Sequence, residues 1–318
     1  MALAFDLIAQ AIQMLLVLAI APLVLGVTRK VKARLLRRIG PPLWQPYIDL
    51  WKLLHKEAVL AHNASWLYRA APYLIFATTW VGAALVPTYA ANLMFSWSAD
   101  LIAIVALLAT GRFALALAGM DVGTAFGGIG SSREVMISSL AEPAMLLVVF
   151  TVALIAGTTQ LSSIATTFVN ASIGLRVSLG LALFAFVFVA IAENARIPID
   201  NPATHLELTM VHEAMVLEYS GRHLAMIEAA AAVKLVLYFS LLACLFLPFG
   251  MATTEKDLGA LAIGIGTYLA KIFVLAAVLP LGETAVAKMR VFRYPIFLGG
   301  AFAASALAVF LLFVSRGF

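Results

Sequence analysis

Long apolar segments separated by short polar connections dominate the pattern of the chain. Each of eight segments holds about 20 or more mostly apolar residues, which is the length that a helix needs to cross the hydrocarbon core of a membrane. Backbone amides inside lipid must be satisfied within the segment, which favours helices. The pattern predicts an all-α integral membrane protein with about eight transmembrane helices, near 7–27, 70–94, 99–119, 138–157, 173–192, 227–248, 259–281 and 295–315.

Composition strengthens this prediction and excludes two classes of protein. Charged residues make up 12% of the 318 positions and hydrophobic residues 64%, whereas soluble domains carry about 25% charged residues. Such a chain is neither a water-soluble enzyme nor a disordered segment. We find no internal repeat and no linker, so residues 1–318 are expected to form one polytopic domain. The N-terminus lacks the basic start of a cleavable signal, so we expect it to be retained as the first span.

The basic residues predict the orientation of the spans. Of 21 Lys and Arg residues, fifteen lie in the connections on one side of the membrane, nine of them within 28–69, and two lie on the other side. Because cytoplasmic loops carry the excess of Lys and Arg, both termini should face outside. The net charge of +5 is then explained by topology, and we expect no nucleic-acid partner.

The first inside connection combines a basic cluster with an amphipathic segment. Apolar positions recur at helical spacing over 43–56, with charged residues on the opposite side. The residues on the two sides are Trp44, Tyr47, Ile48, Trp51 and Leu54, and Asp49, Lys52 and Lys56. The segment is either a simple interfacial anchor or part of a docking platform.

The second inside connection is rich in glycine and then carries two acids. Ser131 and Ser132 precede Arg133 and Glu134, which predicts a helix start at this point. Glu142 follows eight residues later, about two turns on and therefore on the same face. Glu134 could simply cap the helix, but a carboxylate at the depth of Glu142 costs about 2.5–3.5 kcal/mol even on the mildest scale.

The third inside connection is the richest in acids. Asn201 and Pro202 predict the start of a helix and Gly221 its end. The connection could be a solvated cytoplasmic helix, but it is too apolar for an exposed loop. It contains the acids Glu193, Asp200, Glu207, Glu213, Glu218 and Glu228.

Charged residues also fall inside the predicted spans. Such groups usually face a bundle interior or a water-filled path, although each one taken alone could simply pair with a neighbouring helix. Together with the acid-rich connection they favour an ion path. They are Arg112, Glu228, Lys234, Lys271 and Glu283.

Redox chemistry is not expected in this chain itself. Cys244 is the one cysteine, and a lone cysteine cannot hold an iron–sulfur cluster or a structural zinc. His205 and His212 lack the HExxH pattern of a zinc site. Any redox metal must therefore belong to a partner.

Four motifs in order carry a resemblance to a known family. The segments RRIGPPLWQPYIDLWKLLHKE, SSREVMISSLAEP, AENARIPIDNP and EYSGR resemble the membrane subunit that docks the peripheral arm of respiratory complex I, the NADH dehydrogenase subunit 1 family. The variant PIDNPATHLELTMVHEAMVLEYSG is more similar to the homologous subunit of energy-converting nickel–iron hydrogenases of the formate hydrogenlyase type.

The resemblance implies a function and a set of residues. The chain would be a non-catalytic membrane-arm subunit of a redox-driven, ion-translocating complex in the cytoplasmic membrane of a prokaryote. Its docking surface would comprise Arg37, Arg38, Gly40, Pro41, Trp44, Asp49 and Lys52. Its proton path would comprise Glu134, Glu142, Glu193, Asp200, Glu207, Glu213, Glu218, Glu228, Lys234, Lys271 and Glu283.

The same resemblance implies partners and leaves alternatives open. The partners would be hydrogenase-like large and small subunits carrying iron–sulfur clusters and, where it is retained, nickel–iron, with antiporter-like membrane subunits and lipid. One alternative is a quinone-binding subunit of a complex I-type oxidoreductase. Another is a stand-alone secondary transporter, although the chain lacks the repeated halves typical of transporters.

Overall fold

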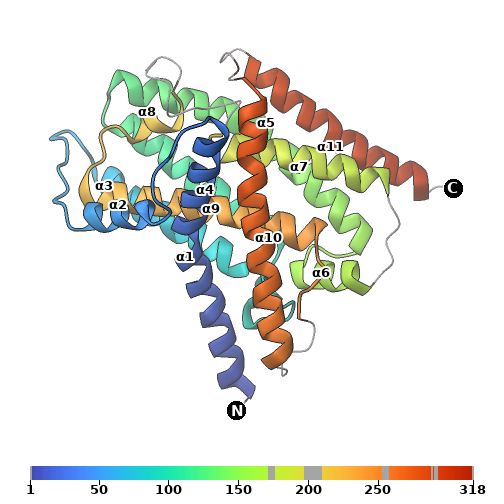
Figure 1. The fold of residues 1–318 in the computed structure, drawn as a ribbon. Helices are drawn as coiled ribbons and strands as arrows, with labels where there is room; N and C mark the ends of the chain where they lie inside the picture. Colours follow the sequence, from blue (N-terminus) through green and yellow to red (C-terminus); the bar gives the residue numbers. More distant parts are fainter. Residues whose placement is uncertain are drawn as a thin grey trace.

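The computed structural model describes residues 2–170, 176–196, 210–252, 258–287, 289 and 293–316. Within these ranges the chain is built from α-helices with one short 3-10 helix and no strand (Figure 1). The prediction of an all-α membrane protein is confirmed.

A helix occupies each of the eight segments predicted to span the membrane. Among the described residues, six helices are long and apolar enough to cross a membrane, and α7 is a shorter apolar helix of 17 residues. The eight helices are α1 (Ala2–Leu35), α3 (Trp66–Leu85), α4 (Leu101–Asp121), α5 (Ala125–Ala156), α7 (Val177–Glu193), α9 (Gly221–Phe246), α10 (Leu258–Ala285) and α11 (Tyr294–Arg316).

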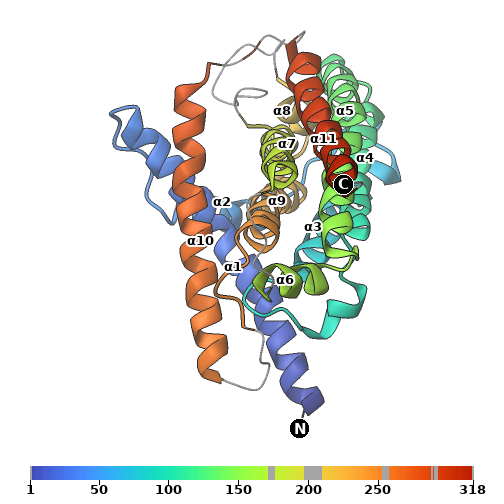
Figure 2. The ribbon, with the colours of Figure 1, turned by 90° about the vertical axis from the view of Figure 1, so that its right-hand side faces the viewer.

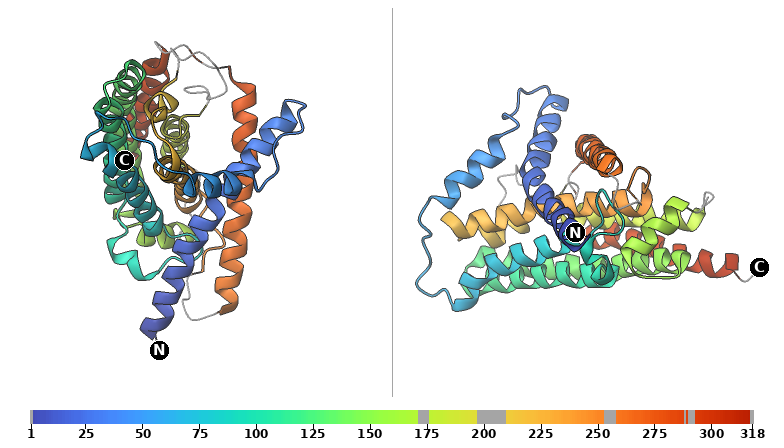
Figure 3. Two further views of the ribbon diagram at one scale, coloured as in Figure 1. Left: turned by 90° about the vertical axis from the view of Figure 1, so that its left-hand side faces the viewer. Right: turned by 90° about the horizontal axis from the view of Figure 1, so that it is seen from below.

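Four shorter helices lie between the long ones. The amphipathic helix predicted over 43–56 is confirmed as α2 (Gln45–Leu54), which packs against α1 and α9 (Figure 3). The sequence did not predict α6 (Leu161–Asn170) or the 3-10 helix η1 (Met94–Ser98). The fourth, α8 (His212–Val216), follows a part of the third inside connection that lies outside the described residues.

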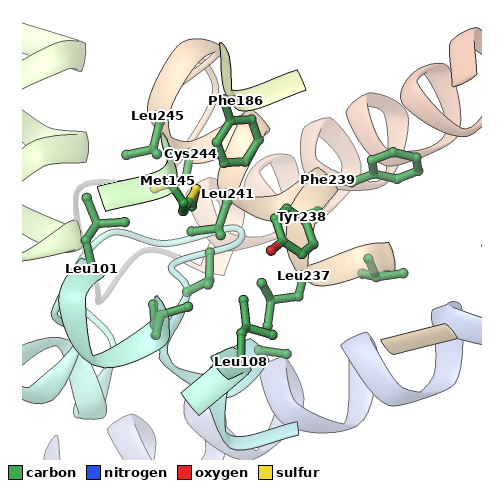
Figure 4. Packing of buried hydrophobic residues seen from close by; sticks show 14 of the residues in the cluster. Leu101, Leu108, Met145, Phe186, Leu237, Tyr238, Phe239, Leu241, Cys244 and Leu245 are labelled. Atoms are coloured by element: carbon green, nitrogen blue, oxygen red, sulfur yellow. The ribbon is translucent and has the colours of Figure 1, made fainter. Parts of the chain in front are cut away.

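Helix α9 runs through the centre of the bundle. Its most apolar window is 72% buried, the largest share among the six long apolar helices. Aromatic and aliphatic side chains of α9, such as Tyr238 and Leu241, pack with Leu108 of α4, Met145 of α5 and Phe186 of α7 (Figure 4). By contrast, α10 packs mainly along α1, and Figure 2 shows it standing apart from α7 and α11.

The predicted second span extends too far in the sequence. Helix α3 ends at Leu85, nine residues before the predicted end, and Pro87 follows shortly after the helix terminus as is common. The last carbonyls of α3 find partners in α1: the side-chain amides of Gln10 and Gln13 donate to the carbonyl of Ala84, at 3.1 and 3.2 Å. Two buried glutamines thus satisfy a helix end that water cannot reach.

The predicted helix start at Ser131 and Ser132 is wrong. Helix α5 begins at Ala125, where the hydroxyl of Thr124 accepts a hydrogen bond from the amide of Gly127 at 3.3 Å. Ser131 lies inside the helix and donates to the carbonyl of Ala116 in α4 at 2.8 Å. Of the glycines that suggested a turn, Gly127 instead allows α4 and α5 to approach closely, as small residues do between membrane helices.

Gly221 begins a helix, whereas the sequence predicted that it would end one. It is the first residue of α9 and has a φ of +51°. A side chain there would lie 2.5 Å from the carbonyl oxygen of Glu57. Beside it, the hydroxyl of Ser220 bonds the amide and the carbonyl of Val59, at 2.8 and 2.9 Å. The first and third inside connections are therefore fastened together.

The close approach of α4 and α5 can be tested with adjacent glycines. A Cβ at Gly127 would lie 2.1 Å from the carbonyl oxygen of Gly119, whereas a Cβ at Gly128 would meet nothing within 4 Å. We expect Gly127→Ala to lose about 1–3 kcal/mol through overpacking. Gly128→Ala should gain up to about 1 kcal/mol from helix propensity. Thermal unfolding midpoints in detergent measure both, and equal midpoints would contradict the packing.

A buried ion cluster as the candidate functional site

Arg112 of α4 is the centre of a charged cluster inside the bundle. Its guanidinium is in direct contact with the carboxylate of Glu193, the last residue of α7. The second oxygen of Glu193 lies 3.1 Å from Nζ of Lys234 on α9. The side chains of Arg112 and Glu193 are 6% and 2% exposed, so this ion pair and its lysine tie together three helices in the interior.

Two acids of α5 complete the cluster. The Glu134 carboxylate lies 3.8 Å from Nε of Arg112, and the Glu142 carboxylate lies 3.8 Å from Nη1. The eight-residue spacing places both acids on one face, as the sequence predicted. With Glu193 and Lys234, the cluster contains three carboxylates and two cations from four helices.

Burial makes the members of this cluster depend on one another. Charges taken out of water lose their hydration, and removing one partner of a buried pair costs about 3–5 kcal/mol. Arg112 suits the central position because its five N–H donors reach several acids in a fixed fork. Glu134 and Glu142 each lie 3.8 Å from Arg112, which is longer than a hydrogen bond. At this separation a water molecule can bridge the two groups.

Two cavities adjoin the cluster, and the larger has room for water. One of about 90 Å³ is lined by Arg112, Glu134, Glu193, Lys234 and also His212. A polar cavity holds a water once it offers about 10–15 Å³ and several polar partners. The second, of about 10 Å³, reaches Glu142 and Tyr238.

The sequence assigned no role in the path to two residues that the structure places here, His212 and Tyr238. Arg112 is one of the charges within spans that favour an ion path, but nothing in its neighbours along the chain marks it as the centre of the cluster. His212 and Tyr238 line the adjoining cavities. No spacing rule connects them with Glu193, because they meet it through tertiary packing.

A second buried acid lies on α10. The Glu283 side chain is 2% exposed. Its carboxylate lies 2.7 Å from Nζ of Lys32 of α1 and 3.6 Å from Nη1 of Arg196, just beyond α7. Burial lowers the pKa of Arg196. The negative charge of Glu283 opposes this shift, and the positive charge of the neighbouring Arg29 adds to it. Glu283 therefore belongs to its own ion cluster rather than to that of Arg112.

Lys271 also lies apart from the Arg112 cluster. Its ammonium donates to the carbonyls of Leu247, at 2.5 Å, and Phe249, just beyond the end of α9, and lies over the Phe249 ring. Leu247 follows Lys234 by thirteen residues, which is about 20 Å along a helix. A direct passage from Lys234 to Lys271 is therefore not seen in the described residues.

The remaining acids of the predicted path are dispersed. Glu228 faces a cavity of about 180 Å³ beside α1 and α2, shared with Arg29 and Asp49, rather than Lys234. Glu213 is half-buried on α8, and Glu218 is exposed in the turn that follows. The predicted positions Asp200 and Glu207 lie outside the described residues.

The predicted docking residues gather on an exposed surface. Arg37 and Arg38 follow the end of α1 and are exposed, as are Trp44 and Lys52 around α2. Arg37 and Gly40 have φ values of +57° and +70°, so the connection turns sharply between the helices. Gly40 and Pro41 are half-buried within this turn.

Asp49 and the aromatic residues of α2 have different environments. Asp49 accepts a hydrogen bond from Gln45 at 2.7 Å, and the hydroxyl of Tyr47 donates to the carbonyl of Ala19 in α1. Trp44 and Trp51 stay 62% and 67% exposed. Of the apolar stripe, Tyr47 fastens α2 to the bundle, and the two tryptophans remain available to lipid or a partner.

Comparisons with known proteins give the relatives of this chain. A family model described as NADH dehydrogenase matches residues 8–314. Hydrogenase-4 component C of Escherichia coli (strain K12) is 34% identical over 87% of this chain and 87% of its own length. Formate hydrogenlyase subunit 4 of the same strain is 32% identical, over 88% of this chain and 90% of its own.

A solved structure of much lower sequence identity shares the fold. A chain in the structure of the membrane-bound sulfane sulfur reductase, an archaeal respiratory membrane complex, superposes with a TM-score of 0.80 at 20% identity. The superposition covers 96% of this chain and 99% of that chain. The likeness therefore extends over nearly the whole helical bundle and concerns the fold.

The family suggested by the four sequence motifs is thus confirmed, and the apolar helices agree with a multi-pass membrane protein. The chain belongs to the NADH dehydrogenase family and is a membrane subunit of a respiratory-complex-I-like or energy-converting hydrogenase complex.

Proposed function

We propose that this subunit docks the peripheral iron–sulfur and nickel–iron module of an energy-converting hydrogenase-like complex and starts the ion path towards antiporter-like subunits. The observation that carries the proposal is the Arg112 cluster, in which Glu134, Glu142 and Glu193 share one guanidinium inside the bundle and Lys234 pairs with Glu193. Intramembrane charges of this kind usually mark ion paths.

The exposure of the acids supports transfer rather than a purely structural pairing. The side chains of Glu193, Glu134 and Glu142 are 2%, 14% and 38% exposed. Exposure of the acids therefore increases from the interior of the cluster to its edge. Acids that face one cation interact with one another, so that a change of charge at one alters the electrostatic environment of the others. The adjoining cavity has room for the water that would connect them.

The docking role is supported by the exposed connection between α1 and α2. Arg37, Arg38 and Lys52 offer positive charge, and the exposed Trp44 and Trp51 offer the aromatic surface typical of protein interfaces. Iron–sulfur clusters and nickel–iron would be held by the partner subunits, and we propose no cofactor for this chain.

Orientation and location are part of the proposal. The contacts of Ser220 with Val59 bring the first and third inside connections to one side, in agreement with the distribution of basic residues. We place that side in the cytoplasm of a prokaryote, with both termini outside the cytoplasmic membrane.

The alternative functions differ in what accompanies the purified chain. The match to the NADH dehydrogenase family keeps, as a second candidate, a quinone-binding subunit of a complex I-type oxidoreductase. A nickel–iron large subunit that copurifies with antiporter-like subunits would support the hydrogenase role, and a tightly held quinone would support the second. Solute transport by the isolated chain in liposomes would overturn both.

Lys234 tests the ion path. Lys234→Ala removes one partner of a buried pair, an effect worth about 3–5 kcal/mol, so we expect ion translocation to fall at least about tenfold. Electron transfer to soluble acceptors should persist, because the redox centres lie in partners. Lys234→Arg keeps the positive charge beside Glu193 and should retain translocation. Normal translocation in Lys234→Ala vesicles would show that Lys234 is structural.

Arg37 and Arg38 test the docking surface. The double variant Arg37→Ala, Arg38→Ala should release the peripheral module at lower salt than the wild-type complex, because exposed ion pairs are screened as ionic strength rises. Native gels of the detergent-solubilised complex over a salt series measure the release. Arg176→Ala, at the exposed start of α7, is the matched control and should leave the complex intact. Full retention in the double variant would exclude these arginines from docking.

A further inference from the structure

A cavity of about 340 Å³ lies between α7, α9, α10 and α11. Its walls are almost entirely apolar, with Phe188 and Ile191 of α7, Phe239 of α9 and Phe297 of α11 among the lining side chains. This size falls within the range of about 300–1,000 Å³ that is typical of ligand pockets. Apolar cavities exclude water and accept apolar ligands.

The cavity adjoins the lipid-facing surface of α10. Val278 and Leu281 of α10 and Val286 just beyond its end line it and remain 52%, 50% and 46% exposed. Because α10 packs mainly along α1, it leaves a gap towards α7 and α11 (Figure 2), and the cavity occupies this region. A chain from the bilayer could thus enter from the side without passing through water.

The inside end of the cavity is polar and carries surplus positive charge. Arg196 and Glu283 line this end, and Lys32 reaches the same Glu283 carboxylate at 2.7 Å. Two cations thus share one acid, and Arg29 acts on Arg196 as a further positive neighbour. The Arg196 side chain is 21% exposed, and its guanidinium lies 3.6 Å from the Glu283 carboxylate, beyond hydrogen-bond length. The arrangement is complementary to an anion.

We propose that this cavity binds an anionic phospholipid, with one acyl chain between α7, α9 and α10 and the phosphate beside Arg196 and Lys32. An acyl chain matches the apolar walls, and a phosphate is the anionic group that an arginine fork binds well. A quinone has a neutral headgroup and would leave the positive charge uncompensated. Asn194 and Tyr238 line both this cavity and the cavities beside the Arg112 cluster. None of the five charged residues of that cluster lines it, so the proposal does not rest on the proposed function.

Gly282 provides a way to block the cavity. It lines the wall on α10, and a Cβ there would meet nothing within 4 Å. Gly282→Leu therefore adds a bulky side chain at the cavity wall without a clash at the backbone. Gly266 lies on the same helix with equally open surroundings and is not among the lining residues. Gly266→Leu is the matched control.

The test uses the full chain in its purified membrane complex. After delipidation in detergent, the thermal midpoint is measured with dioleoyl-phosphatidylglycerol or dioleoyl-phosphatidylcholine added, and retained lipid is identified by native mass spectrometry. We expect phosphatidylglycerol to be retained and to raise the midpoint by several degrees more than phosphatidylcholine. Gly282→Leu should lose both effects, and Gly266→Leu should keep them.

Arg196→Gln separates the headgroup from the acyl chain. It should abolish the preference for phosphatidylglycerol and leave a smaller, equal response to both lipids. Equal responses in the wild-type protein, retention of phosphatidylglycerol by Gly282→Leu at the wild-type level, or a copurified quinone that Gly282→Leu displaces would each overturn the proposal.

Discussion

The contact between Arg112 and Glu193 is the interaction on which the interior depends. Neither side chain has enough access to water to be hydrated, so each must be compensated by the other and by Glu134, Glu142 and Lys234. That requirement fixes the rotation of four helices about their axes, because each must present its charged residue to one point. Apolar packing alone is tolerant of such rotation in lipid, where the hydrophobic effect does not drive one helix face against another.

Much of the architecture could be predicted from the sequence. The eight apolar segments follow from the length that a membrane demands, and the amphipathic helix α2 follows from the helical spacing of Trp44, Tyr47, Trp51 and Leu54. The shared face of Glu134 and Glu142 follows from helical periodicity. These features are local, so a stretch of sequence contains all the information needed.

The errors arose where local patterns gave way to tertiary contacts. The glycines before Ser131 have the composition of a turn, yet they form helix because the backbone of α4 passes close to Gly127. Gly221 has the composition of a helix end, yet it begins α9. Its positive φ and the close approach of the Glu57 carbonyl explain why glycine is needed there. The convergence of Tyr238 and His212 near Glu193, and the distance of Lys271 from Lys234, depend on the packing of whole helices and leave no mark on residue spacing.

The buried glutamines of α1 have a consequence for biosynthesis. Helices of a membrane protein enter the bilayer in chain order, and α1 is followed by α2 before α3 emerges. Until α3 arrives, the carboxamides of Gln10 and Gln13 face hydrocarbon without the carbonyl of Ala84, and an unsatisfied polar group in lipid costs several kcal/mol. The first helix therefore reaches a stable position in the bilayer only when the second long helix packs against it. Insertion of α1 and α3 at the translocon is thus coupled.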